Sequence, residues 1–285
     1  MTSPLPFVLV HGAWHGAWAY EQVIPHLAAL GHSSVARDLP AHGLNARFPD
    51  SFHQRPINPA LFATEPSKVA GTTLDDYVAS IEATINALVS AGHAKVVLVG
   101  HSMGGVPITA VAERMPEKIA RLVYLTAFMP ASGVPGVSYI SATENEGEMV
   151  GLQLMADPAQ VGALRMDHRS TDENYIRNAK LAFYADVSDE NFAAAAHLLT
   201  PDTPVGPFAT PIATTKARWG SVQRHYIKCL QDRAIRPMLQ QRFIDEANAF
   251  VPENLTQVHE MASSHSPFLS QPLELAKLLA HIARQ

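Results

Sequence analysis

Short apolar runs rich in β-branched residues alternate along the chain with segments of helical periodicity. The apolar runs are typical of buried strands, and they cover residues 7–11, 33–36, 95–99, 122–126, 225–229 and 257–261. Helical spacing is clearest over 73–91, over 106–115 and at the end of the chain, from Leu273 to Ile282. Strands separated by helices predict an α/β fold, with a mostly parallel central sheet and helices on both of its faces.

The helix expected over 73–91 has start and stop signals as well as periodicity. Thr72 is a suitable N-cap, Asp75 adds a carboxylate to the first turn, and Gly92 is placed to end the helix. We therefore expect this helix to be one of those that cover the sheet.

Two segments interrupt the alternation of strands and helices. Residues 44–71 contain four prolines and show no period, and we interpret them as a surface insertion. Residues 129–217 separate two core strands and are too long for a simple crossover, although helical pieces are expected over 174–184 and 189–199. We expect 129–217 to form a cap over the strand ends, inserted into an α/β core made of 1–128 and 218–285.

Composition and charge exclude several functional classes. Apolar residues make up 47% of the 285 residues and the net charge is −5 without a basic block, which argues against nucleic acid and anionic membranes as partners. No signal peptide or membrane-spanning run is recognisable, so we expect a cytoplasmic protein. The 14 histidines form no His-x-x-x-His pair on a predicted helix, and Cys229 is the only cysteine, so we expect no metal site and no disulfide.

The strongest chemical signal is Gly100-His101-Ser102-Met103-Gly104-Gly105, directly after the apolar run at 95–99. A Gly-x-Ser-x-Gly sequence between a strand and a helix is typical of a nucleophile elbow, a strained turn that exposes one serine hydroxyl above a sheet. Glycines on either side allow neighbouring backbone to approach closely. Ser102 is therefore the candidate nucleophile, and it needs a base to accept its proton.

The order nucleophile, acid, base expected for this topology points to His265 as the base. His265 follows the run at 257–261 and precedes the final helix, whereas His259 lies inside a strand and His281 inside a helix. On its own, His265 would be read as a polar loop residue, but the elbow favours a catalytic role.

The acid is expected just after the preceding strand, where Asp232 stands. Its role would be to orient the imidazole and stabilise the imidazolium, and the alternative is a turn or helix-cap aspartate. Asp245 and Glu246 lie on the next predicted helix and are expected to be solvated.

An oxyanion hole needs two backbone N–H groups that point at the developing negative charge. Met103 follows the nucleophile and supplies one, and Ala13, in the loop after the first strand, is the expected second donor. Gly12 permits a tight backbone there, while His11 and His15 are expected to hold the loop rather than act as bases.

Together these segments resemble the α/β-hydrolase superfamily, and within it the plant methyl esterase and hydroxynitrile lyase group with its bacterial esterase relatives. The similarity lies in residues 7–18, Gly31-His32, Asp38-Leu39, the elbow, 122–130 and the segments around Asp232 and His265. Lyases of this group carry a threonine where this chain has Gly12, and a lysine where it has Ser263. The resemblance therefore implies ester hydrolysis, with no cofactor.

The substrate pocket is expected between the elbow and the cap, with a mainly apolar lining. The main candidates are Gly12, Trp14, Phe128, Met129, Phe183 and Trp219, with Leu152, Leu154, Tyr184, Phe192 and Phe208 behind them, and packing is an equal explanation for each. Such a pocket suits a small to medium apolar or aromatic ester. A cofactor-free lyase and a receptor-like binding protein are the alternatives. A homodimer through the final helix and the cap is compatible with the sequence, although no residue indicates it.

Overall fold

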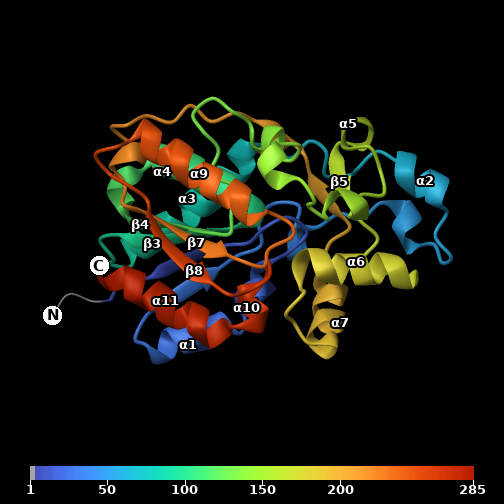
Figure 1. Cartoon of the computed structure of the whole chain (residues 1–285), viewed down its shortest axis with the longest axis horizontal. Helices are drawn as coiled ribbons and strands as arrows, with labels where there is room; N and C mark the ends of the chain where they lie inside the picture. Colours follow the sequence, from blue (N-terminus) through green and yellow to red (C-terminus); the bar gives the residue numbers. More distant parts are fainter. Residues whose placement is uncertain (1–3) are drawn as a thin grey trace.

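A parallel six-stranded sheet forms the centre of the computed structural model, which describes residues 4–285 (Figure 1). The strands lie in the order β2-β1-β3-β4-β7-β8, and every neighbouring pair is parallel. Their bounds are β1 (Phe7–Val10), β2 (Ser34–Ala36), β3 (Val96–His101), β4 (Ile119–Leu125), β7 (Arg224–Cys229) and β8 (Gln257–Met261). The parallel α/β architecture expected from the alternating pattern is confirmed.

Successive side chains of the inner strands β1, β3, β4 and β7 enter two different hydrophobic layers. Phe7 and Leu9 of β1 pack in one layer, with α1 (Val23–Ala29), α10 (Pro267–Ser270) and α11 (Pro272–Arg284). Val8 and Val10 face the other, with α3 (Leu74–Ser90), α4 (Gly105–Arg114) and α9 (Pro237–Phe250). Because both faces are covered, the strands read as continuous apolar runs rather than as alternating ones.

The helix α3 begins one residue later than the sequence analysis expected. Its N-cap is Thr73, not Thr72: the Thr73 hydroxyl accepts the Asp76 N–H, and the Asp76 carboxylate accepts the Thr73 N–H at 2.8 Å. Thr72 also has an aspartate three positions later, Asp75, so the capping-box pattern fits both threonines, and the structure shows that Thr73 forms the pair. Gly92, at a φ of +101°, follows the helix in the left-handed conformation.

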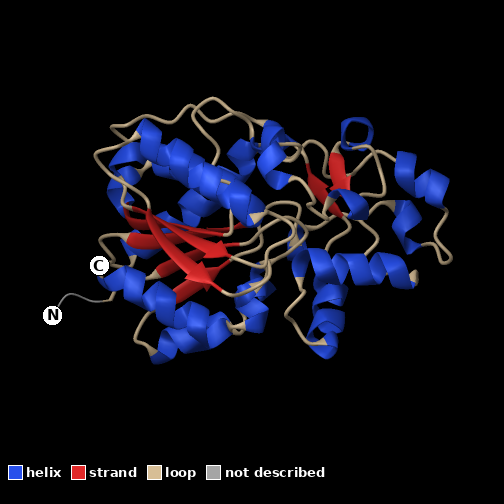
Figure 2. Cartoon of the chain, viewed as in Figure 1, coloured by secondary structure: helices blue, strands red, loops and turns tan. Residues whose placement is uncertain are grey.

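We refer to residues 129–217 as the cap segment. It contains a separate antiparallel pair, β5 (Ala163–Arg165) and β6 (Asp202–Pro204). Around this pair lie the helices α5 (Pro158–Val161), α6 (Glu173–Phe183), α7 (Asp189–Leu198) and α8 (Gly206–Ala209). The arrowheads of the central strands point toward this part of the molecule (Figure 2). The division of the chain into core and cap stays a prediction.

A buried ion pair holds β5 to β6 and to the proline-rich segment 44–71. Arg165 Nε and Nη2 donate to the two carboxylate oxygens of Asp202 at 2.7 and 2.8 Å, and both side chains are fully buried. Arg165 Nη1 donates to the carbonyls of Phe62 and Glu65, at either end of the last turn of α2 (Pro59–Thr64). Because Phe62 is itself buried, segment 44–71 contributes to the interior as well as to the surface.

Within residues 4–285 no helix is long and apolar enough to cross a membrane. The same residues contain no group of three histidine, cysteine or acidic side chains placed to hold a metal ion.

Candidate active site

The candidate site lies between β1 and β3, where the order in which strands are added to the sheet reverses. β1 pairs with β2 on one side and with β3 on the other, so the loops that follow β1 and β3 diverge to opposite faces. Such a switch point leaves a crevice at the carboxyl ends of the strands. Ser102 directly follows β3, and Gly12 lies in the loop that follows β1.

Ser102 occupies a strained turn. Its φ is +54°, a left-handed conformation that side chains other than glycine rarely adopt. A Cβ at Gly104 would lie 2.6 Å from the His11 carbonyl oxygen, and a Cβ at Gly12 would lie 2.6 Å from the Ser102 Cβ. The two loops are thus in direct contact, and only glycine fits at these two positions.

His265 and Asp232 form a buried pair next to this turn. His265 Nδ1 and Asp232 Oδ2 lie 2.6 Å apart, and both side chains are at most 1% exposed. Asp232 follows β7, and His265 follows β8, as the order of motifs predicted. With Nδ1–H donated to a carboxylate, Nε2 of the neutral ring is free to accept a proton.

Every other contact of the Asp232 carboxylate is also with a donor. Oδ1 accepts the N–H groups of Ala234 and Ile235 at 2.6 and 2.9 Å, and Oδ2 accepts the Thr126 hydroxyl at 2.5 Å. Thr126 follows β4 and has a φ of +37°. Sequence reasoning missed Thr126, although its position at the carboxyl end of a predicted strand placed it near the site.

A third histidine ties the His265 loop to the elbow. His101 Nε2 donates to the His265 carbonyl at 2.9 Å, and the two rings are 4.6 Å apart. The structure therefore brings Ser102, His101 and His265 to one edge of the sheet, although no hydrogen bond joins the Ser102 hydroxyl to His265 within residues 4–285. In free enzymes such bonds are often long and tighten only when substrate is bound.

Ser102, Ala13 and Met103 line a common cavity of about 70 Å³. Trp14, Phe128 and Phe183 line it as well, as predicted for pocket residues. Further apolar side chains complete the lining: Ile140, Val150, Leu154, Leu164, Phe208 and Ile235. The nucleophile thus faces a small and mainly apolar space.

Six predicted pocket residues do not line the Ser102 cavity in the part of the chain described: Gly12, Met129, Leu152, Tyr184, Phe192 and Trp219. Trp219 donates its indole N–H to the Tyr124 hydroxyl at 3.0 Å, and the Arg224 guanidinium stacks on its ring at 4.3 Å. Large apolar side chains suit a hydrophobic core as well as they suit a substrate pocket. In the structure, Met129 and Trp219 both pack in the core.

The polar residues of the lining, Asn145 and Glu148, carried no signal in the sequence. Glu148 accepts the N–H groups of Val150 and Gly151, the nearer at 2.6 Å. Asn145 accepts the Arg236 N–H at 3.0 Å. Both belong to a stretch of short 3-10 turns, where no periodicity marks which side chains face inward.

The backbone of the loop at 11–15 is clamped by the cap segment through Trp14. The Trp14 N–H donates to Thr203 Oγ1 at 2.7 Å, its indole N–H donates to the Leu164 carbonyl at 2.9 Å, and its carbonyl accepts the Thr200 N–H at 2.9 Å. Trp14 has a φ of +60° and so needs its surroundings to hold it. These bonds hold the peptide unit that joins Ala13 to Trp14, which is next to the unit that carries the Ala13 N–H.

His15 strengthens the same clamp. Its Nδ1–H donates to the Ala13 carbonyl at 2.7 Å, and its Nε2 accepts the Tyr184 hydroxyl at 2.7 Å. Burial lowers the pKa of His15 to about 3, so the ring is neutral at physiological pH. His11 donates to the Gly12 carbonyl and accepts the Leu39 N–H. Both histidines thus have both ring nitrogens engaged in holding the loop.

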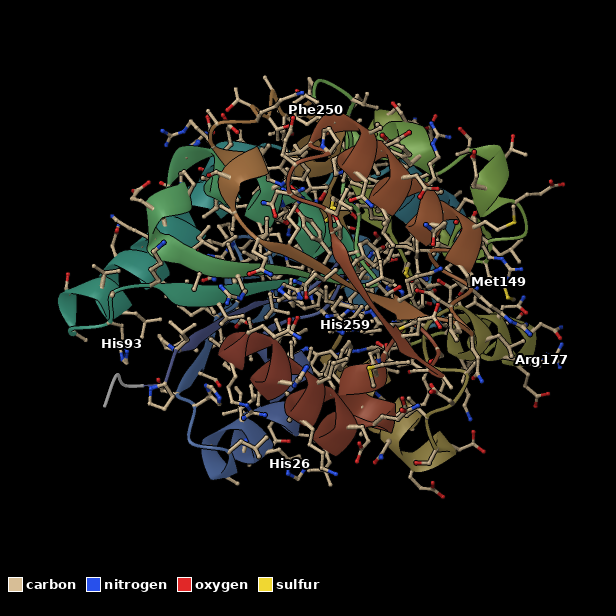
Figure 3. The ribbon with its side chains drawn as sticks, turned by 60° about the vertical axis from the view of Figure 1, so that its left-hand side comes forward. His26, His93, Met149, Arg177, Phe250 and His259 are labelled. Atoms are coloured by element: carbon tan, nitrogen blue, oxygen red, sulfur yellow. The ribbon has the colours of Figure 1, made fainter. Side chains whose placement is uncertain are left out.

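The remaining candidate bases are distant from Ser102 in the fold. His259 lies on β8, where its Nε2 is 3.1 Å from His225 Nδ1 (Figure 3). His281 lies in α11 and contacts Gln285. Neither lines the Ser102 cavity among the described residues.

Comparison with known proteins identifies relatives over nearly the whole chain. The model of the alpha/beta hydrolase family matches residues 7–278. The chain is 30% identical to Methylesterase 9 of Arabidopsis thaliana, covering 97% of both chains, and 30% identical to Salicylic acid-binding protein 2 of Nicotiana tabacum, covering 98% and 97%. Among solved structures, polyneuridine aldehyde esterase is 26% identical with a TM-score of 0.71, covering 98% and 99%. A pyrethroid hydrolase, 24% identical with a TM-score of 0.76 and 98% coverage of both, shares the fold.

Proposed function

The chain belongs to the alpha/beta hydrolase family and is an ester hydrolase, and we propose that Ser102, His265 and Asp232 carry its reaction as a catalytic triad. The observation that carries this proposal is the buried 2.6 Å contact between His265 Nδ1 and Asp232 Oδ2, adjacent to the strained Ser102 turn. The pair sets the imidazole tautomer that leaves Nε2 as the base.

In the first half of the reaction, Ser102 Oγ attacks the ester carbonyl while His265 Nε2 takes its proton. The carbonyl oxygen becomes an oxyanion, which the N–H groups of Ala13 and Met103 bind. The C–O bond to the alcohol then breaks, and the alcohol leaves with the proton from His265. The product of this half is an acyl group on Ser102.

In the second half, water replaces the alcohol. His265 Nε2 takes a proton from the water, whose oxygen attacks the acyl carbon, and the same two N–H groups bind the oxyanion. Return of the proton to Ser102 Oγ releases the acid. Asp232 stabilises the imidazolium in both halves and does not itself take the proton.

The environment of Gly12 supports ester hydrolysis over the lyase alternative. A Cβ at this position would lie 2.6 Å from the Ser102 Cβ and 3.0 Å from His101 Nδ1. The threonine that the lyases carry here does not fit without movement of the elbow. Ser263, at the position of their lysine, is buried and uncharged, and its hydroxyl bonds within its own loop. We propose as substrate a neutral ester with an apolar or aromatic part, in keeping with the apolar lining of the cavity.

Turnover of 4-nitrophenyl acetate by the wild type and by Ser102→Ala tests the assignment. We expect kcat to fall by roughly 10⁴- to 10⁶-fold, because the residual rate comes only from binding and the oxyanion hole. Ser90→Ala, which changes an exposed serine at the end of α3, is the matched control and should retain full activity. Equal turnover by Ser102→Ala and the wild type would overturn the role of Ser102.

A further inference from the structure

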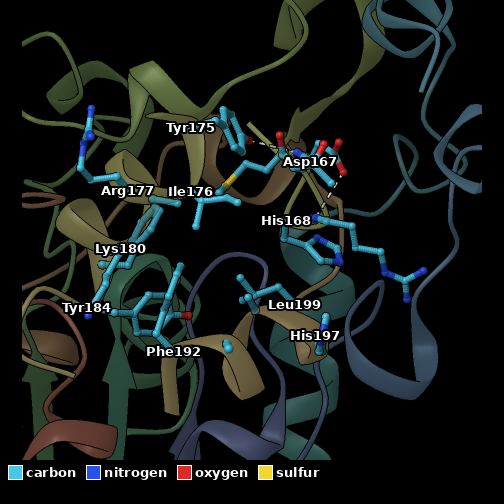
Figure 4. A pocket seen from close by; sticks show the side chains of 18 of the residues that line it. Asp167, His168, Tyr175, Ile176, Arg177, Lys180, Tyr184, Phe192, His197 and Leu199 are labelled. Carbon is cyan, nitrogen blue, oxygen red and sulfur yellow. Dashed lines mark hydrogen bonds between the residues drawn. The ribbon is translucent and has the colours of Figure 1, made fainter. Parts of the chain in front are cut away.

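A second and much larger cavity, of about 750 Å³, lies in the cap segment between α6, α7 and residues 166–171 (Figure 4). Ile176, Phe192 and Leu199 supply apolar surface from different elements. Nothing in the reaction described above uses this cleft, although it lies next to the Ser102 cavity.

Phe183 is the one residue, among those described, that lines both cavities. It ends α6 and is 5% exposed, and its ring centroid lies 5.7 Å from the Trp14 ring and 5.9 Å from the His265 ring. The aromatic ring therefore borders both the space beside Ser102 and the cleft.

The sizes of the two cavities decide what each can hold. A cavity of roughly 150 Å³ accommodates benzene, so the 70 Å³ beside Ser102 suits a group of only about two or three heavy atoms. An ester extends from its carbonyl in two directions, as an acyl half and an alcohol half. When one half fills the small cavity, a larger second half needs space elsewhere, and the cleft beyond Phe183 has ten times the volume.

The charges around the cleft cancel, so its ligand is expected to be neutral. Lys180 is paired with Asp189, and Asp167 is paired with Arg55 at 3.3 Å. Arg177 and Glu173 also line the cleft and carry opposite charges, and the Arg169 guanidinium lies over the Phe52 ring.

One polar group in the cleft is without a protein partner. Both ring nitrogens of His168 are buried and make no hydrogen bond within residues 4–285. Burial, together with the guanidinium groups of Arg169 and Arg55, lowers the pKa of His168 to about 3, so the ring is neutral. A neutral imidazole can serve a hydroxyl or carbonyl group of an otherwise apolar ligand.

We propose that the cleft between α6 and α7 is the subsite for the larger, uncharged apolar half of the ester, and that Phe183 is the partition that limits the smaller half to two or three heavy atoms. The inference rests on the proposed function of Ser102. It predicts that esters with one large half are good substrates, whereas esters with two large halves are poor ones.

The first test fills the cleft. Ala193 and Ala194 are adjacent exposed residues of α7, but only Ala193 lines the cleft. Ala193→Phe should lower kcat/KM for 2-phenylethyl acetate by roughly tenfold or more, chiefly through KM, and leave ethyl acetate unchanged. Ala194→Phe should change neither. The subsite would be overturned if Ala193→Phe left the ratio of kcat/KM for the two esters unchanged, or if Ala194→Phe lowered kcat/KM for 2-phenylethyl acetate equally.

The second test removes the partition. Phe183→Ala should raise kcat/KM for 2-phenylethyl octanoate relative to 2-phenylethyl acetate by roughly tenfold, because the small cavity would then open into the cleft. An unchanged ratio in a folded variant would overturn the role of Phe183. If that variant does not fold, Ala193→Phe still decides the subsite, since it changes an exposed position.

A binding measurement separates this inference from the reaction itself. Calorimetric titration of Ser102→Ala with 2-phenylethyl acetate should show binding, which Ala193→Phe in the same background weakens and Ala194→Phe does not. Binding of this kind without Ser102-dependent turnover would retain the subsite and reject the proposed function. Turnover that depends on Ser102, with no difference between Ala193→Phe and Ala194→Phe, would retain the proposed function and reject the subsite.

Discussion

The candidate site has two sides that are built in different ways. On the strand side, Ser102, Asp232 and His265 each stand within four residues of the end of a central strand. On the cap side, Trp14 is held by Leu164 and Thr203, which are 150 and 189 positions away in the sequence. The strand side is fixed by the register of a parallel sheet, whereas the cap side depends on contacts between segments that meet only in the folded chain.

This difference assigns different tasks to the two sides. In the proposed reaction, the strand side contains the groups that exchange protons and form the acyl bond, and its geometry follows from a covered parallel sheet. The cap side supplies no proton-transfer group to the proposed reaction. It holds the backbone that carries the Ala13 N–H, and through Phe183 it limits the space beside Ser102. Changes on the strand side should therefore abolish the chemistry, and changes on the cap side should tune it.

After Ser102→Ala, Asp232→Asn should have the largest effect. The amide can present N–H to His265 Nδ1, which favours the wrong tautomer of the ring and removes the base at Nε2. We expect kcat for 4-nitrophenyl acetate to fall by about 10³- to 10⁴-fold, with little change in KM. Steady-state kinetics measures the loss.

Asp245→Asn is the matched control, because it makes the same change at an exposed aspartate of α9. Its activity should equal that of the wild type. If Asp232→Asn retained more than about a tenth of the wild-type kcat, the strand side would not contain the acid that orients His265.

The sequence predicted the strand side well because each of its residues has a local signal. A buried run ends, a turn follows, and the reactive side chain stands in that turn, as for Ser102 and Asp232. Errors were small where the signal was local: the N-cap of α3 is Thr73 rather than Thr72, and both threonines have an aspartate three positions later, so the local pattern fits either.

The cap side could not be predicted in the same way. β5 and β6 are three residues each and pair across 37 positions or more, so no hydrophobic period reveals them. Met129 and Trp219 were expected in the pocket because they are large and apolar, yet size and apolarity also suit the core, where both are packed. Thr203, which accepts the Trp14 N–H, has no neighbour in sequence that marks it.

The buried ion pair of the cap segment gives the next largest effect, on stability. Asp202→Asn leaves the Arg165 guanidinium buried without its carboxylate, and breaking a buried pair in this way costs about 3–5 kcal/mol. Urea unfolding should show this decrease in the free energy of unfolding. Replacing both partners, as Arg165→Met with Asp202→Leu, should restore much of the loss, because no buried charge then remains. A double variant less stable than Asp202→Asn would contradict this account.

Thr203→Val tests the clamp on Trp14 with the smallest expected effect. Valine has nearly the same shape as threonine but cannot accept the Trp14 N–H, which is then left buried without a partner at a cost of about 1–3 kcal/mol. Trp14, at a φ of +60°, can relieve this cost by turning, and the Ala13 N–H then turns with it. We expect kcat to fall by roughly tenfold with KM little changed, since an oxyanion donor acts mainly in the transition state.

The serine variant separates the hydrogen bond from packing. Thr203→Ser keeps the hydroxyl and loses the methyl group, so it should retain most of the wild-type kcat if the bond to Trp14 is what matters. Two results would show that the cap side shapes the cavity without positioning the oxyanion donor. One is a rise in KM rather than a fall in kcat for Thr203→Val, and the other is an equal fall in kcat for Thr203→Ser. Recovery of kcat by serine alone would place the hydroxyl of Thr203, 189 positions from Trp14, among the groups that the reaction depends on.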